Sequence, residues 1–113
     1  MTRRTYLAPP PFSLEGGPTG ISLVHGYTGS PPEMRLLGDY LSARVITVRA
    51  PLLPGPGRNV EEMNRTKRTD WTGHCQKALD QLKDRCAKVY VSGLSVGAVI
   101  TLFLTSRNHD IAG

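Results

Sequence analysis

The pentapeptide Gly93-Leu94-Ser95-Val96-Gly97 constrains the fold of this chain more than any other feature. It follows an apolar run at residues 89–92 that is typical of a buried strand, and it leads directly into an apolar run that is typical of a helix. A turn this tight leaves no room for side chains at its flanks, and glycine on both sides meets that requirement. The sequence therefore predicts a sharp strand-turn-helix unit with Ser95 at its apex.

Two interpretations of Ser95 follow from the pattern. At the apex of such a turn the hydroxyl projects out of the backbone, where it can act as a nucleophile, and the N–H groups of the next helix can hold a developing negative charge. The alternative is an ordinary strand-to-helix turn of another doubly wound protein, in which Ser95 only caps the helix. The pentapeptide alone does not separate them, because glycine and serine are common in turns.

The bulk properties indicate one packed domain, residues 1–113, with 39% hydrophobic and 20% charged residues. No run approaches the roughly 20 apolar residues of a membrane span, and the first residues lack the apolar stretch of a secretory signal, so we expect no membrane anchor. The net charge is +5, but the basic residues are scattered apart from Arg65, Lys67 and Arg68. We interpret that cluster as a solvated loop and expect no nucleic-acid partner.

Both cysteines, Cys75 and Cys86, fall in one helical pattern. A rise of about 1.5 Å per residue sets their Cα atoms roughly 16 Å apart, which is too far for a disulfide. We therefore expect reduced thiols on the inner face of a helix and a cytoplasmic location. No Cys/His pair has the spacing of a zinc site, and we expect neither a metal nor a cofactor.

Strands and helices alternate along the chain. We expect strands at residues 20–25, 44–48 and 88–92, and helices from Pro31 to about Ala43, from Thr69 or Asp70 to Cys86, and over residues 96–106. Residues 1–19 suit either an edge strand or a tethering arm. This alternation predicts an α/β fold with three αβα layers, a mostly parallel sheet and right-handed crossovers.

Two of these helices carry a detailed expectation. Ser30 and Glu33 have the spacing of a capping box around Pro31, and Met34, Leu37 and Leu41 form the expected apolar stripe of the first helix. The inner face of the second helix is expected to carry Trp71, Cys75, Ala78, Leu79, Leu82 and Cys86.

Three loops follow the predicted strands, at residues 25–29, 51–57 and 93–97. The carboxyl ends of parallel strands meet at one end of a sheet, and ligands bind there in open α/β folds. The sequence therefore places a candidate site where these three loops converge.

Several motifs occur in the same order as in a known superfamily. They are residues 23–29 (LVHGYTG), 32–37 (PEMRLL), 50–55 (APLLPG), 61–64 (EEMN), 70–71 (DW) and 93–97 (GLSVG). Together they resemble the α/β-hydrolase superfamily, and more narrowly bacterial carboxylesterases and monoacylglycerol lipases, from about Pro9 to Thr105. The resemblance implies an α/β-hydrolase fold and a serine hydrolase that acts on small-molecule acyl esters.

The resemblance also implies roles for individual residues. Ser95 would be the nucleophile, and the backbone N–H groups of Tyr27 and Val96 would form the oxyanion hole. His25 and Gly26 would shape the oxyanion loop as structural residues, and Gly93 and Gly97 would shape the turn around the nucleophile. Leu52, Leu53 and Leu94, together with Tyr27, are candidates for an acyl pocket, although ordinary packing explains them equally well.

The chain departs from the pattern after the nucleophile. In the family the triad acid and histidine follow the serine, whereas here His109 and Asp110 lie beyond the helix, roughly 15–20 Å away at 1.5 Å per residue. We interpret them as a surface pair, and His74 belongs to a different helix. We therefore expect the N-terminal portion of one α/β-hydrolase domain, truncated after the helix that follows Ser95, which lacks the triad acid and base and is inactive as given.

Further departures and alternatives bear on the same question. Gly55-Pro56-Gly57 stands where relatives often carry Gly-His-Gly, which we expect to change only the loop shape, and Ala98 replaces a common second glycine. A non-catalytic binding or interaction module on the same scaffold is the main alternative, because fold does not fix function. A nucleotide-binding domain is disfavoured, because the glycine loops lack phosphate-binding motifs.

Overall fold

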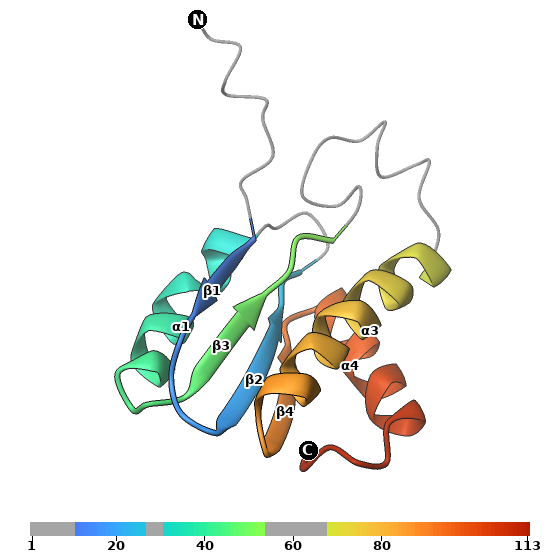
Figure 1. Ribbon diagram of the computed structural model, residues 1–113. Coiled ribbons are helices and arrows are strands. Elements are labelled where there is room, and N and C mark those ends of the chain that lie inside the picture. The colour runs from blue at the N-terminus through green and yellow to red at the C-terminus, as the bar shows by residue number, and fades with distance from the viewer. Residues whose placement is uncertain (1–10, 27–30, 54–67) are drawn as a thin grey trace, which may run out of the picture.

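The sheet has four strands in the order β1-β3-β2-β4. The computed structural model describes residues 11–26, 31–53 and 68–113 (Figure 1). The strands are β1 (Phe12–Leu14), β2 (Thr19–Val24), β3 (Thr47–Ala50) and β4 (Lys88–Gly93). β2 pairs in parallel with both β3 and β4, while β1 pairs with β3 in the antiparallel direction. The expected mostly parallel sheet is confirmed, and β1 is one of its two edge strands.

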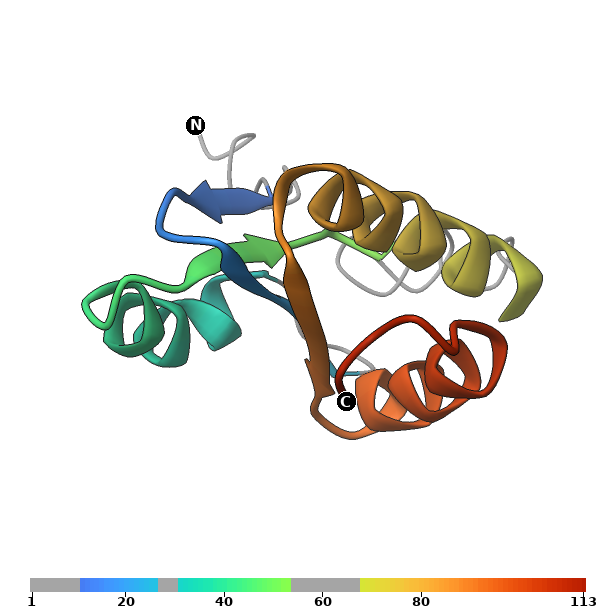
Figure 2. The same cartoon turned by 60° about the horizontal axis from the view of Figure 1, so that its bottom comes forward.

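Helices cover both faces of this sheet, as the αβα prediction requires. A 3₁₀ turn, η2 (Pro31–Met34), leads into α1 (Arg35–Ser42) on one face. α3 (Arg68–Arg85) and α4 (Val96–Arg107) pack on the other face (Figure 2). None of the helices among the described residues is both long and apolar enough to cross a bilayer.

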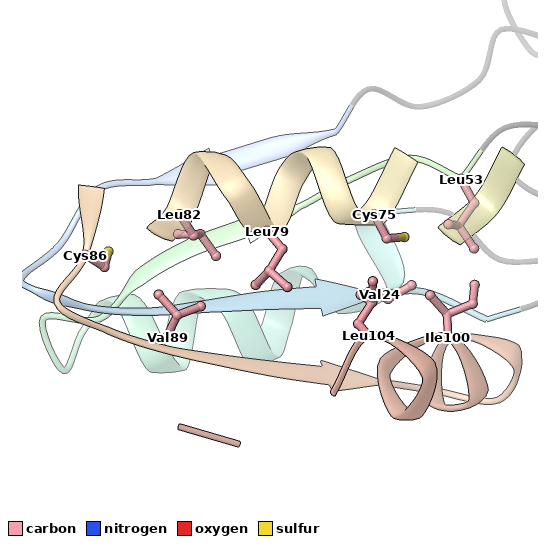
Figure 3. Packing of buried hydrophobic residues seen from close by; sticks show 9 residues of the cluster. All are labelled: Val24, Leu53, Cys75, Leu79, Leu82, Cys86, Val89, Ile100 and Leu104. Atoms are coloured by element: carbon pink, nitrogen blue, oxygen red, sulfur yellow. The ribbon is translucent and has the colours of Figure 1, made fainter. Parts of the chain in front are cut away.

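The core divides into two clusters because successive residues of a strand point to opposite faces. In β2, Leu23 packs under α1 and Val24 packs under α3 and α4. The larger cluster is shown in Figure 3 and consists of Val24, Leu53, Cys75, Leu79, Leu82, Cys86, Val89, Ile100 and Leu104. The smaller cluster consists of Leu23, Met34, Val48 and Ala50.

The apolar stripe predicted for the first helix is wrong at Leu37, which is 42% exposed. Met34 is buried and Leu41 packs against the smaller cluster, as predicted, while Gly38 is buried in the place expected for Leu37. The helix begins as a 3₁₀ turn, whose tighter winding shifts the phase of the residues that follow. Gly38 then faces the sheet, where an added Cβ would lie 3.0 Å from Cε1 of Phe12.

The second strand begins later than expected, at Thr47 rather than Arg44. Val45 has a φ of 64° and is 65% exposed, so it belongs to the turn that closes α1. Its N–H donates to the carbonyl of Ser42 and its carbonyl accepts from the N–H of Gly17. The β-branched pair Val45-Ile46 favours a strand by propensity, but these tertiary hydrogen bonds override that preference.

The inner face predicted for the second helix, α3, is confirmed at its most buried positions. Cys75, Leu79 and Leu82 are fully buried on α3, and Cys86 is buried just after the helix ends. Both cysteines are free. α3 approaches β2 closely at Gly20, where a Cβ would lie 2.7 Å from Sγ of Cys86.

Candidate active site

Ser95 joins β4 to α4 in a backbone conformation that side chains rarely adopt. Its φ is 61° and its ψ is −123°, and Val45 is the other non-glycine residue with a positive φ in the described part of the chain. Such a conformation costs about 1–3 kcal/mol and persists only where the surrounding structure enforces it. Strain of this kind at an exposed serine is a specific indication of a functional site.

The two flanking glycines enforce this turn. A Cβ on Gly93 would collide with the carbonyl oxygen of Gly97, and a Cβ on Gly97 would collide with the carbonyl oxygen of Val24. The obstacles are backbone atoms, which cannot rotate away. The turn is also tied to β2, because the N–H of Leu94 donates to the carbonyl of Val24 at 3.1 Å. The end of β2, the end of β4 and the start of α4 therefore meet in direct backbone contact.

The side chain of Ser95 is exposed and makes no capping hydrogen bond, although Ser95 is the N-cap residue of α4. The backbone of Ser95 starts the helix instead, because the carbonyl of Ser95 accepts from the N–H of Ala98 at 2.9 Å. The alternative in which the hydroxyl serves as a helix cap is therefore wrong. Val96 is the first residue of α4, so its N–H has no acceptor within the helix and lies at the positive end of the helix dipole.

His25 is fully buried and holds two loops together through both ring nitrogens. The N–H of Leu53 donates to Nε2 at 3.0 Å, so Nε2 is the unprotonated nitrogen and Nδ1 donates to the carbonyl of Gly26 at 3.0 Å. Burial lowers the pKa of His25, against smaller raising effects of the hydrogen bond to Gly26 and the charge of Glu33. Both ring nitrogens are thus occupied by backbone groups, which is the arrangement expected of a structural histidine.

Gly26 lies between Ser95 and Glu33. An added Cβ would lie 3.3 Å from Cβ of Ser95 and 3.4 Å from Oε1 of Glu33. The N–H of Gly26 donates to Oε1 of Glu33 at 2.6 Å. The carboxylate that the sequence pattern assigns to a capping box thus bonds to the loop after β2, while α1 is capped by Met34 without a side-chain hydrogen bond. Ser30, the other member of that box, lies outside the described residues.

The remaining histidine and carboxylate candidates are elsewhere. His109 and Asp110 follow the C-cap of α4, Asn108, roughly 18 Å from Ser95 at 1.5 Å per helical residue. Asp110 forms an ion pair with Lys83 at 3.2 Å, and that contact lowers the pKa of its carboxyl group. His74 lies on α3 beside a groove that Lys77 and Arg49 also line. These groups therefore lie on other parts of the fold than the turn that carries Ser95.

The three leucines proposed for an acyl pocket differ in how far they are buried. Leu53 is fully buried in the larger core cluster, so packing accounts for it. Leu52 is half-buried, and Leu94 is 52% exposed next to Ser95. Of the two expected oxyanion donors, Val96 lies at the turn and Tyr27 lies outside the described residues.

No protein-family model matches the chain. It is 42% identical over 103 residues to a thermostable monoacylglycerol lipase of Bacillus sp. (strain H-257), covering 91% of this chain and 41% of that protein. It is 35% identical over 99 residues to a carboxylesterase of Bacillus subtilis (strain 168), covering 87% of this chain and 40% of that protein. The chain thus spans about two fifths of the length of these curated relatives.

Solved structures of lipolytic enzymes are also similar to this chain. A structure from a study of LipS and LipT, two metagenome-derived lipolytic enzymes, matches 92% of this chain and 42% of its own with a TM-score of 0.86 and 31% identity. The chain has the α/β-hydrolase fold. A laboratory-evolved potato epoxide hydrolase, with a TM-score of 0.71 and 25% identity over 89% of this chain and 33% of its own, shares the α/β-hydrolase fold.

Sequence reasoning missed one residue, Glu33, near the candidate nucleophile. The local pattern assigns Glu33 to a helix cap and gives no sign of its contact with Gly26. The signal that was available is the place of Glu33 shortly after a glycine-rich loop, where a carboxylate can accept from the N–H groups of the loop as readily as from those of a helix.

Among the described residues, no group of three or more His, Cys, Asp or Glu side chains is placed to hold a metal ion.

Proposed function

We propose that this chain carries the nucleophile of a serine hydrolase of carboxylic esters. The observation that supports the proposal most is the strained, uncapped Ser95 at a glycine-flanked turn between strand and helix. A serine held in this way has no structural task that another residue could not perform with less strain. Its hydroxyl is left available for attack on an ester.

In the proposed reaction, Oγ of Ser95 attacks the acyl carbonyl carbon while a base removes its proton. The carbonyl oxygen becomes an oxyanion, which the N–H groups of Val96 and Tyr27 stabilise; one such donor is typically worth about 2.7–4 kcal/mol. The alcohol leaves with the proton from the base, and water then hydrolyses the acyl-enzyme to release the acid and restore the serine.

The base and the acid of the triad are proposed to come from outside these 113 residues. Support comes from the geometry, because His25 is occupied by two backbone groups and His109 lies beyond the far end of α4. Without a base the hydroxyl remains a poor nucleophile, and only the residual rate from the oxyanion hole is expected. The 113-residue chain by itself is therefore proposed to be inactive.

The proposed substrates are short- to medium-chain acyl esters or monoacylglycerols. The lipase and esterase relatives motivate this class, and the exposed Leu94 beside Ser95 suits an acyl chain.

We also propose a cytoplasmic location, because both cysteines are free thiols.

The test is hydrolysis of p-nitrophenyl esters and monoacylglycerols by the full-length gene product, with Ser95→Ala and Ser106→Ala variants. Ser106 is a matched control, because it is exposed and its hydroxyl only bonds the carbonyl of Phe103. Loss of activity in Ser95→Ala alone supports the proposal. Equal activity of both variants contradicts it.

A second function is an interaction module without catalysis. The observation that favours it is that both ring nitrogens of His25 are bonded to backbone groups, while His109 lies beyond the far end of α4. A full-length product that hydrolyses none of the esters would favour this function over the first.

A further inference from the structure

Both backbone polar groups of Gly26 are held by side chains. The carbonyl accepts from Nδ1 of His25 at 3.0 Å, and the N–H donates to Oε1 of Glu33 at 2.6 Å. The second contact is short and involves a carboxylate, which makes it one of the stronger classes of hydrogen bond. Glu33 itself comes from η2, so this bond ties the start of the first helical segment to the loop after β2.

The position of Gly26 matters because of what surrounds it. It lies against Cβ of Ser95 and the carbonyl of Leu94 on one side and against Glu33 on the other. A peptide unit is planar, so fixing the N–H and the C=O of one residue orients the two peptide units on either side of it. Gly26 is thereby fixed beside the turn that carries Ser95.

We propose that Glu33 is a positioning residue for the oxyanion loop, because its carboxylate accepts from the N–H of Gly26 and holds Gly26 against Ser95. This rests on the proposed hydrolase function. The role is mechanical: Glu33 supplies a hydrogen-bond acceptor to the loop and touches neither the substrate nor the reacting atoms. It complements His25, which holds the same residue from the opposite side.

Two substitutions separate the acceptor from the charge. Glu33→Gln keeps an oxygen acceptor at the same length and removes the charge, whereas Glu33→Ala removes both. Because Glu33 is exposed, neither change is expected to prevent folding. Asp39→Ala is the matched control, since Asp39 is an exposed carboxylate of α1 that pairs with Arg35 at 2.9 Å.

The first readout is steady-state ester hydrolysis by the full-length gene product. An oxyanion loop that is displaced from Ser95 weakens binding of the transition state more than binding of the substrate. We expect Glu33→Ala to lower kcat roughly ten-fold with little change in KM, and Glu33→Gln and Asp39→Ala to stay within about two-fold of the parent. Unchanged kcat in Glu33→Ala, or an equal loss in Glu33→Gln, overturns the proposal.

The second readout does not depend on catalysis. In the ¹⁵N-labelled 113-residue chain, a strong hydrogen bond shifts the Gly26 amide proton downfield and slows its exchange with solvent. We expect both signatures to be lost in Glu33→Ala and retained in Glu33→Gln and Asp39→Ala. Loss of the signatures in an enzyme whose kcat is unchanged refutes the positioning role, whereas the expected signatures in a protein without esterase activity refute the proposed function alone.

Discussion

The α-carbon of Gly97 faces the carbonyl oxygen of Val24 so closely that no side chain fits between them. This contact joins the first turn of α4 to the last residue of β2, and it brings the carboxyl end of β2 to the turn that carries Ser95. The glycines of the pentapeptide therefore serve two purposes, because they permit the turn and let two segments far apart in sequence touch.

Gly97→Ala is expected to destabilise the chain by about 3 kcal/mol or more, since the obstacle is backbone that has to move. The free energy of unfolding from urea titration measures this. Gly73→Ala is the matched control: Gly73 is exposed in α3, and no atom lies within 4 Å of the place that an added methyl group would occupy. There the same change should stabilise by about 0.5–1 kcal/mol through helix propensity. Equal effects at the two glycines would contradict the close contact.

Ser95→Gly is expected to raise the free energy of unfolding by about 1 kcal/mol relative to Ser95→Ala, because glycine adopts a positive φ without strain. Neither variant carries the hydroxyl, so the comparison isolates the backbone. If the alanine variant proves as stable as the glycine variant, Ser95 is not strained.

The pH dependence of stability should report the buried His25. Its pKa is lowered from 6.5 by burial, so the unfolded chain binds more protons than the folded chain at pH values below 6.5. The contribution of His25 to the free energy of unfolding is therefore fully present above that pH, and it declines as the pH falls toward the lowered pKa. We expect the urea concentration at the midpoint of unfolding to decrease as the pH is lowered from about 7.5 to about 5.5. The decrease should be smaller in His25→Gln.

His74→Gln is the control for that titration. The pKa of His74 is also lowered, by burial and by Lys77, but this histidine is exposed and should account for less of the decline. A decline that vanishes in His74→Gln and survives in His25→Gln would contradict the role given to His25.

The thiol of Cys75 should resist alkylation in the folded chain. It is fully buried, and burial raises its pKa to about 12, so almost no thiolate forms near neutral pH. Iodoacetamide followed by mass spectrometry is expected to modify Cys75 only after denaturation with urea. Rapid modification of the native protein would show that α3 does not cover it as described.

Asn108 should stabilise the packing of α4 on α3. It is buried, and its side chain exchanges hydrogen bonds with Gln76, accepts from Lys83 at 3.0 Å and donates to the carbonyl of Leu104. Asn108→Ala leaves several of these groups unpaired and should cost about 1–3 kcal/mol in urea titration. Asp110→Ala, which removes an exposed partner of Lys83, should change stability little; an equal loss would argue against this network.

The sequence was most informative where one requirement dominates. Glycines at positions 93 and 97 and the apolar runs around them predicted the strand-turn-helix unit, because few other sequences satisfy such a turn. The buried positions of α3 also followed from periodicity, since the helix packs one face on the sheet. The start of β3 was misplaced because strand propensity at Val45 competes with tertiary hydrogen bonds that only the folded chain makes.

The contact of Glu33 with Gly26 was missed for a related reason. A capping box is a local pattern, whereas the bond from Gly26 to Glu33 spans seven residues and no periodicity encodes it. Leu37 was misassigned because the 3₁₀ turn of η2 altered the helical phase before α1 began. These errors all arise where geometry set by distant residues overrides a local preference.

Site-mapped labelling with a fluorophosphonate tests the central assignment most directly, because the reagent forms a covalent adduct only with an activated serine. On the full-length gene product, peptide mass spectrometry is predicted to find the adduct on Ser95, and to find none in Ser95→Ala. An adduct on another serine, or no adduct on a folded full-length protein, would contradict the assignment of Ser95 as the nucleophile.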